Sequence, residues 1–488
     1  MTAVSQTAAQ RRAALNGVLA YLITGTVALI ALMLLGLLMR LAQAEIITLP
    51  ANRFYEILTL HGAGMVGVAG LTGLAIMWHF LRAYLPLSIG VFLANLALFV
   101  LGVAMILASV WPGGFAGAWT FLHPLPALSM GVWGKGAAAL FLGGLLAIGS
   151  GFLLVYLDVA RTLFARYGNL GRALGWPQLF GRDDGHAPPP AVIAASMVVI
   201  VNIVGIVTGA SILTMMLVNL YLPAFTIDAL LAKNLIFFFG HVFINATIYM
   251  AVIAVYEILP HYTHRPWKSN KVFLAAWTAS TVMVMTVYPH HLLMDFVMPK
   301  WVLITAQVIS YLSGLPVLVV TAFGVLMNVY RSGIRWDLAS GLLFLAAFGW
   351  AAGVIPAIVD ATIVVNKVMH NTLWVPGHFH TYLLLGMMSM VLGFLYYLGR
   401  PEPRAREPLL DRVAFWLYGL ATLGFTLSFL SSGRVSIPRR YAVHLPEWLP
   451  YDRLGAMFAA LVVAAVAVFI LRFLGRIRVV PRRHEART

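Results

Sequence analysis

The 488-residue sequence contains no cysteine. This absence excludes disulfide bonds, cysteine-ligated iron–sulfur clusters, thiolate zinc or copper centres and covalently attached c-type haem from this chain. Any such redox relay would belong to another subunit. Acidic residues are also scarce, with only 16 Asp and Glu, mostly between apolar stretches. Few carboxylates are therefore left for a proton wire.

Charged residues make up 10% of the chain, whereas soluble domains carry about 25%. Hydrophobic residues make up 61% and gather in about twelve stretches near the ~20 residues that cross a bilayer. The approximate centres of these stretches are residues 28, 70, 99, 146, 203, 246, 282, 315, 348, 386, 423 and 465. The pattern predicts an all-α, polytopic membrane protein, with residues 1–488 forming one domain of about 12 transmembrane helices.

The net charge of +16 does not predict nucleic-acid binding, because the basic residues are distributed asymmetrically. The N-terminal segment, with no evident cleavable signal peptide, is expected to be a cytoplasmic tail. About 22 of the 32 basic residues then fall on the inner side, as the positive-inside rule requires. The inner group comprises Arg11, Arg12, Arg161, Arg166, Arg172, Arg182, Arg265, Lys268, Lys271, Arg331, Arg335, Arg400, Arg404, Arg406, Arg412 and the tail from Arg472 to Arg487. Both termini are therefore predicted to be cytoplasmic.

Six histidines lie within or beside the apolar stretches. His61 begins the second stretch, His241 lies in the sixth, and the other four are His290, His291, His378 and His380, at the end of the seventh and the start of the tenth. Because successive spans run in opposite directions, all six fall in the outer part of the bilayer. Ionisable groups there are costly and mark functional sites. Any one alone could be a core residue, but six at one depth predict a haem or metal centre.

The segment "WVPGHFH" (residues 374–380) separates two histidines by one residue. Successive helical residues advance by about 100°, so these two side chains lie about 200° apart. They therefore predict ligands to two different partners. His61 and one of the two could hold a haem from both sides, and the other could hold a second haem from one side. His241, His290 and His291 would then suit copper or non-haem iron.

These motifs resemble the catalytic subunit I of the haem–copper oxidase superfamily over nearly the whole chain. "HNTLWVPGHFH" (residues 370–380) is similar to the form in the B-type, ba3-like branch. "LTLHG" around His61 resembles the helix that holds the low-spin haem, and "GAWTFLHPLP" (residues 117–126) resembles an outer loop of the family. "IPRRY" (residues 437–441) resembles the arginine pair that binds haem propionates.

The resemblance implies two haems and one copper or non-haem iron ion, with copper favoured by the all-histidine ligands. His61 and His380 would ligate the low-spin haem, and His378 the high-spin haem. His241, His290 and His291 would ligate the second metal of the binuclear centre. The residues implied near the propionates are Arg439, Arg440, His370 and Asn366.

The sequence departs from the oxygen-reducing members at one position. B-type members have a tyrosine four residues after the first metal-binding histidine, and here the residue is Asn245. Another branch supplies the phenol about twenty residues before the histidine pair, near Asn270 here. Tyr288 and Tyr249 are the nearest phenols, but Tyr288 is expected to face away and Tyr249 to lie too far.

The expected proton path below the site is also incomplete. Ile248 and Val252 stand where the family has tyrosines, and Tyr256 and Ser310 could form only a fragment of it.

Asparagine has no redox chemistry and no titratable proton, but it can donate and accept hydrogen bonds. Reduction of nitric oxide, 2NO + 2e⁻ + 2H⁺ → N₂O + H₂O, needs no cleavage of an O–O bond. We therefore expect a respiratory nitric oxide reductase in which Asn245 is catalytic beside the three metal-binding histidines. One alternative is a B-type cytochrome c oxidase that uses Tyr288 or a partner's residue. The other is a haem-free membrane transporter.

The expected partners follow from the resemblance and the missing cysteines. A second subunit would carry a copper or haem c electron-input site, with cytochrome c or quinol as donor and NO or O₂ as substrate. The expected location is a bacterial or archaeal cytoplasmic membrane, with the binuclear site toward the outer face.

Overall fold

The computed structural model describes residues 7–477 and 480, except residues 183–184, 186, 296 and 400–406. Within these residues, twelve helical segments are long and apolar enough to cross a membrane, and no strand occurs. The all-α fold and the number of spans predicted from the sequence are therefore confirmed. The basic residues Arg400, Arg404 and Arg406 and those that follow Ile477 lie outside the described residues.

Spans one to five, nine and eleven are unbroken α-helices: α1 (Ala8–Gln43), α2 (Ala51–Leu81), α3 (Ile89–Val110), α4 (Lys135–Tyr167), α7 (Pro190–Tyr221), α13 (Leu338–Ala361) and α17 (Leu409–Arg434). The remaining spans combine shorter elements: α8 (Ala229–Ala251) with α9 (Ile253–Thr263), α10 (Lys271–Thr286) with η1 (Tyr288–Leu292), α11 (Lys300–Ser313) with α12 (Leu315–Val329), α15 (Trp374–His380) with η2 (Thr381–Met388) and α16 (Ser389–Gly399), and η3 (Pro446–Trp448) with α18 (Leu449–Arg476). Three short helices lie in connections: α5 (Leu170–Ala173), α6 (Trp176–Leu179) and α14 (Ile363–Met369).

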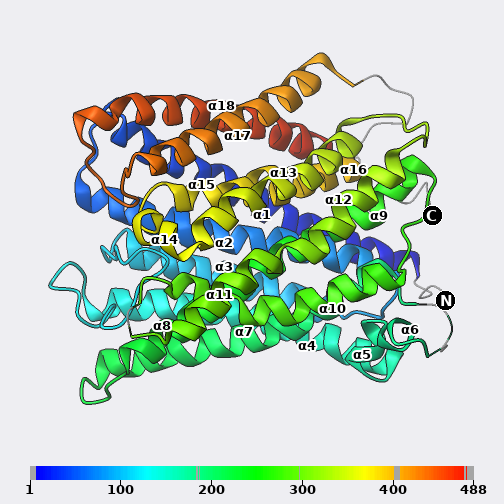
Figure 1. Ribbon diagram of the computed structural model, residues 1–488, viewed down its shortest axis with the longest axis horizontal. Coiled ribbons are helices and arrows are strands. Elements are labelled where there is room, and N and C mark those ends of the chain that lie inside the picture. Colours follow the sequence, from blue (N-terminus) through cyan, green and yellow to red (C-terminus); the bar gives the residue numbers. More distant parts are fainter. Residues whose placement is uncertain are drawn as a thin grey trace.

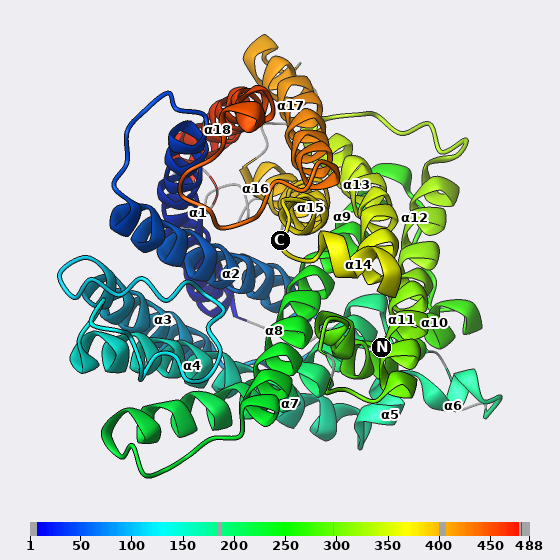
Figure 2. The ribbon, with the colours of Figure 1, turned by 60° about the vertical axis from the view of Figure 1, so that its left-hand side comes forward.

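The spans form one bundle in which α1 begins and α18 ends at the same end (Figure 1). Sequence neighbours pack as antiparallel pairs, including α3 with α4 and α17 with α18, and α1 packs against α18. In Figure 2, α15 and α16 lie near the centre of the bundle. Within one 18-residue apolar stretch of each span, 83% of the α8–α9 span and 72% of the α15–α16 span is buried, whereas only 22% of the α11–α12 span is buried. The histidine-bearing spans six and ten therefore belong to the interior.

Polar side chains fix where the central helices begin. Asp228 caps α8, since its Oδ1 accepts a hydrogen bond from the backbone N–H of Leu231 at 2.7 Å. Asn270 caps α10 through the N–H of Phe273 at 2.9 Å. At the position where another branch of the family is expected to place a phenol, Asn270 therefore starts a helix.

Candidate functional site

A cavity of about 710 Å³ lies inside the bundle, lined by residues of α1, α2, α8, η1, α13, α15, η2, α17 and α18. The residues singled out from the sequence that line it are His61, His241, Asn245, His290, His291, His370, His378, His380, Arg439 and Arg440. Most other lining residues are apolar. The structure thus brings side chains from five separate segments of the chain to one cavity.

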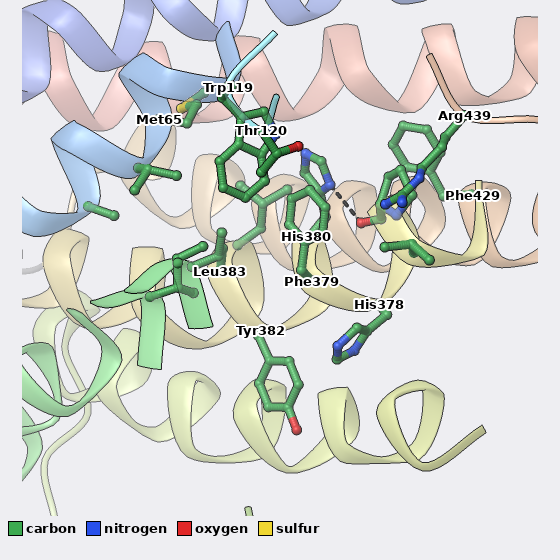
Figure 3. Close-up of a pocket in the computed structure, with 18 of the residues that line it drawn as sticks. Met65, Trp119, Thr120, His378, Phe379, His380, Tyr382, Leu383, Phe429 and Arg439 are labelled. Carbon is green, nitrogen blue, oxygen red and sulfur yellow. Dashed lines mark hydrogen bonds between the residues drawn. The ribbon is translucent and has the colours of Figure 1, made fainter. Parts of the chain in front are cut away.

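His378 and His380 project from opposite sides of α15. Figure 3 shows His380 on the side of Trp119 and Thr120, and His378 on the other side with Tyr382. The geometry predicted for a helical pair separated by one residue is therefore present. The span continues as the π-helix η2, and π-helical turns are frequent at functional sites.

His61 and His380 each have one ring nitrogen on a backbone carbonyl. His380 Nδ1 lies 2.7 Å from the oxygen of Pro376, and His61 Nδ1 lies 2.8 Å from the oxygen of Leu32. A carbonyl only accepts hydrogen bonds, so Nδ1 carries the proton and Nε2 keeps its lone pair. A donated Nδ1–H that fixes the ring is usual for metal-ligating histidines. Each residue could therefore hold a haem iron through its Nε2 atom.

Close packing fixes the positions of these two rings. A Cβ atom at Gly36 of α1 would lie 2.6 Å from Cε1 of His61, so glycine is needed for the ring to approach α1. His380 stacks on Phe429, with ring centroids 5.5 Å apart and an interplanar angle of 26°.

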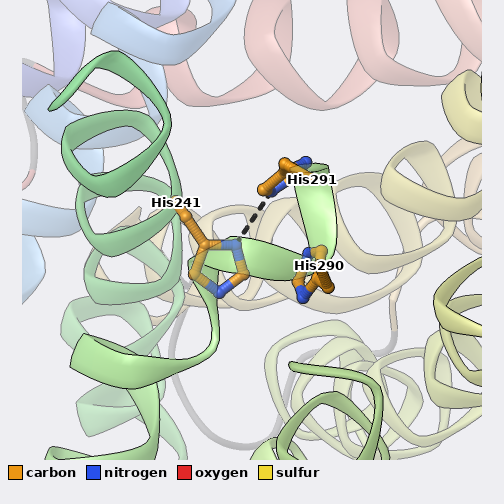
Figure 4. A group of neighbouring side chains, drawn as sticks. All are labelled: His241, His290 and His291. Atoms are coloured by element: carbon orange, nitrogen blue, oxygen red, sulfur yellow. Dashed lines mark hydrogen bonds between the residues drawn. The ribbon is translucent and has the colours of Figure 1, made fainter. Parts of the chain in front are cut away.

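His241, His290 and His291 form the candidate metal centre (Figure 4). One ligand nitrogen from each lies within 4.8 Å of the other two, and His241 Nδ1 is 3.1 Å from His291 Nε2. The two adjacent histidines converge because α10 ends at Thr286 and the chain continues as the 3₁₀-helix η1. Three neutral imidazoles at this spacing fit copper or iron.

Asn245 lies one turn after His241 and lines the same cavity. Its Nδ2 lies 2.9 Å from His241 Nε2 and 3.0 Å from the His241 carbonyl oxygen. Since Asn245 occupies Nε2, His241 Nδ1 is the nitrogen left to bind a metal, and it faces His291. If a metal bound Nδ1, the proton of the neutral ring would be on Nε2. The Nε2–H would then donate to the amide oxygen of Asn245, which reaches this position when the amide group is rotated by 180°.

Phenols are present near the site, but none of the described hydrogen bonds or ring contacts of the three histidines involves a tyrosine. As expected, Tyr288 is directed elsewhere: its hydroxyl donates to Asn234 Oδ1 at 3.1 Å. Among the described residues, the tyrosines that line the cavity are Tyr249 and Tyr382. The Tyr382 ring lies edge-on to His378, with centroids 5.3 Å apart.

Tyr256 and Ser310, the expected fragment of a proton path, lie in different surroundings. Ile248 and Ser310 line the cavity, whereas the hydroxyl of the buried Tyr256 pairs with Thr321 at 2.6 Å.

Two half-buried arginines, Arg439 and Arg440, line the cavity. The Arg439 N–H donates to the Asn371 carbonyl at 2.8 Å, and Arg440 Nη2 donates to Thr120 at 2.6 Å. Burial lowers the pKa of Arg439 to about 10, with the charge of Arg440 adding to the effect, and burial also lowers the pKa of Arg440. Both guanidiniums remain charged at neutral pH. Two adjacent, half-buried positive charges fit anionic groups such as haem propionates.

His370 lies in the same region. Its burial, together with the nearby Arg439, Lys233 and Arg440, lowers its pKa to about 4. Asn366, predicted to lie near the propionates, does not line the cavity; its amide donates to the carbonyl of Asp360 at 2.7 Å. Asp360 is the residue that lines the cavity there.

Neither Asp360 nor a group of charged residues near His61 and His380 was found from the sequence. Arg40 Nη2 donates to Asp452 at 2.9 Å, and the guanidinium lies 4.9 Å above the ring of Phe429. His444 Nδ1 lies 2.7 Å from the other oxygen of Asp452. Arg40 is 412 positions from Asp452 in the chain, and His444 is 8 positions from it. No local sequence pattern therefore connects Arg40 with Asp452.

The chain matches the family model "Cytochrome C and Quinol oxidase polypeptide I" over residues 17–475. It is 25% identical over 467 residues to cytochrome c oxidase subunit 1 of Corynebacterium glutamicum, covering 89% of this chain and 75% of that protein. It is 26% identical over 270 residues to cytochrome c oxidase subunit 1 of Thermus thermophilus, covering 51% of this chain and 48% of the relative.

A third relative is the haem–copper oxidase subunit I+III of Aeropyrum pernix, 24% identical over 251 residues. That match covers 50% of this chain and only 30% of the relative, so the chain spans half or less of the Thermus and Aeropyrum proteins in these matches. A solved haem–copper terminal oxidase dimer has the same fold, with a TM-score of 0.78 and 21% identity, covering 98% of this chain and 84% of the solved chain.

Proposed function

Because the chain belongs to the cytochrome c and quinol oxidase polypeptide I family of oxidoreductases, we propose that it is a nitric oxide reductase that converts 2NO to N₂O. We assign it to the B-type branch on the form of "HNTLWVPGHFH". Two electrons and two protons complete the reaction, with one oxygen atom leaving as water.

His61 and His380 would hold the low-spin haem through their Nε2 atoms, and His378 the high-spin haem. His241, His290 and His291 would hold the second metal, copper or iron. The bound haems and metal would supply the redox couples that deliver the two electrons. Arg439 and Arg440 would bind the propionates, with His370 beside them.

The observation that carries this proposal is the contact between Asn245 and His241. Where an oxygen reductase has a phenol bonded to this histidine, an amide here lies 2.9 Å from Nε2. An amide cannot deliver the electron and proton that O–O cleavage demands, but it fixes the orientation of His241 and can hydrogen-bond a polar ligand. Reduction of NO does not require the missing phenol.

The environment of the chain is part of the proposal. Electrons would come from cytochrome c or quinol, through a partner subunit if a thiolate copper or haem c site is involved, since this chain has no cysteine. Both termini would be cytoplasmic, and the cavity would lie toward the outer face of a bacterial or archaeal cytoplasmic membrane.

An oxygen reductase is the second candidate. The relatives named cytochrome c oxidase favour it, and Tyr249 and Tyr382 offer phenols on the cavity wall. Tyr288 is the weaker choice, because its hydroxyl is bonded to Asn234.

The test is turnover of the purified enzyme with NO and with O₂, with haem, copper and iron measured on the same sample. We expect N₂O formation to be fast and O₂ consumption to be slow. Asn245→Ala should slow NO reduction by about one to two decades, as loss of a hydrogen bond worth roughly 1.5–3 kcal/mol would do. Haem content should not change. Fast four-electron O₂ reduction with little N₂O would refute the proposal, and absence of a Soret band would favour the transporter alternative.

A further inference from the structure

Two bonds attach the segment that carries His290 and His291 to α8. Lys233 Nζ donates to Asp295 Oδ2 at 2.9 Å, and the Tyr288 hydroxyl donates to Asn234 Oδ1 at 3.1 Å. Tyr288 precedes the histidine pair and Asp295 follows it. The two bonds therefore flank the pair on both sides, and we call these four residues the clasp.

Aromatic contacts extend the same attachment. Phe237 stacks on His291, with centroids 5.2 Å apart and an interplanar angle of 13°. Phe238 meets the ring of Tyr288 edge-on at 5.4 Å. Positions 233, 234, 237 and 238 share one face of a helix, so the segment lies along a single face of α8, one to two turns before His241.

Backbone bonds alone hold this segment weakly. η1 is a five-residue 3₁₀-helix, and 3₁₀-helices have poorer hydrogen-bond geometry than α-helices. Beyond it, the chain turns through bonds from the Asp295 N–H to Leu292 and from the Val297 N–H to Asp295 Oδ1. Asp295 thus organises the turn and binds Lys233 with its other oxygen. Side-chain bonds to α8 are needed to fix where the segment lies.

The clasp is partly shielded from solvent. The Asp295 side chain is 12% exposed and that of Lys233 is 30% exposed, and both residues line the cavity. The candidate metal ligands are the three histidines, and none of the four clasp residues is among them. The clasp residues can therefore act on a bound metal through the positions of the histidines.

We propose that the clasp positions His290 and His291 against α8, so that the three-histidine centre retains its metal. The inference rests on the metal centre of the proposed function. Metal sites require ligand distances within about 0.2 Å of their ideal values, and a supporting shell decides whether a site is tight or loose. Lys233, Asn234, Tyr288 and Asp295 are positioning residues in this scheme.

The test follows metal retention in the purified holoenzyme. Wild type, Lys233→Met and Asp295→Asn are incubated with EDTA, and copper and iron are measured against haem over time. Both variants should lose the non-haem metal about ten-fold faster, as is typical when supporting contacts of a metal site are removed. Haem content and the low-spin spectrum should stay as in wild type. The exchange variant Lys233→Asp/Asp295→Lys should recover part of the retention, because it restores the ion pair but not the acceptor for the Val297 N–H.

Arg161→Met is the matched control. It removes the 2.7 Å ion pair between Arg161 and Asp158 of α4, neither of which lines the cavity, and should not change metal loss. Tyr288→Phe tests the second bond by removing one hydroxyl, even if the Lys233 variant does not accumulate. We expect it to speed metal loss about three-fold, a smaller share of the effect of a supporting contact.

Equal rates of metal loss in wild type and in all the clasp variants would overturn the positioning role alone. A wild-type enzyme with full haem but no further copper or iron would overturn the metal centre itself, and the clasp proposal with it.

Discussion

The close contact between His61 and Gly36 predicts that Gly36→Ala, which adds one methyl group to α1, will prevent binding of the proposed low-spin haem. In Gly36→Ala the new Cβ would lie 2.6 Å from Cε1, 2.9 Å from Nδ1 and 3.3 Å from Nε2 of His61. Ordinary contacts begin at 3.4 Å, so the ring must retreat by about 0.8 Å. A metal–ligand bond tolerates about 0.2 Å, and the required movement is about four times larger.

The retreat also breaks the hydrogen bond from His61 Nδ1 to Leu32, which leaves a buried donor unpaired at a cost of about 1–3 kcal/mol. The gain in helix propensity from glycine to alanine is about 1 kcal/mol. The fold should therefore persist while the proposed low-spin site fails.

Reduced-minus-oxidised spectra, haem content and CO difference spectra measure the outcome. We expect loss of the low-spin signal, about half the haem, and retained CO binding at the other haem. Gly17→Ala on the same helix is the control, because its Cβ would meet Phe92 at an ordinary 3.5 Å. A Gly36→Ala enzyme with its full low-spin spectrum would refute the assignment of His61 or the geometry of its packing.

Three further predictions concern other parts of the site. His380→Ala should remove the low-spin spectrum and His378→Ala the CO-binding one; loss of CO binding in His380→Ala with an intact low-spin signal would reverse the assignment. A small cysteine- or haem-bearing subunit should copurify, and full turnover of the isolated chain with reduced cytochrome c would argue against it. His370, with its pKa lowered from 6.5 to about 4, binds a proton more readily when the chain is unfolded. The free energy of unfolding should therefore fall by up to about 3 kcal/mol as the pH drops from about 6.5 to 4. His370→Gln should reduce this pH dependence in denaturation curves recorded across that range.

The sequence was sufficient to predict the spans and to select the side chains that meet in the cavity. Spans follow from apolar length, which the bilayer dictates. His378 and His380 project to opposite sides because helical rotation requires it. The histidines were found from their common depth in the spans, whereas the paired arginines were found through a short motif that the family resemblance made recognisable.

Contacts between distant segments could not be predicted in the same way. Lys233 and Asp295 are separated by 62 positions, and each alone reads as an ordinary charge near a span end. Asn366 was selected through the family resemblance, yet Asp360 is the residue that lines the cavity, since α13 ends between them. The need for glycine at position 36 could not be predicted from the sequence, because it depends on the position of the His61 ring. The extent of the single domain remains a prediction.

The π-helix η2 sets the two halves of span ten out of phase. A π-turn closes one residue later than an α-turn, which equals a one-residue insertion and rotates everything downstream by about 100°. The first half can therefore turn its histidines to the cavity, while the second half directs Tyr396 toward the buried Asp411 of α17. An alignment of this span, without a gap, to a regular α-helix would therefore assign one half to the wrong face.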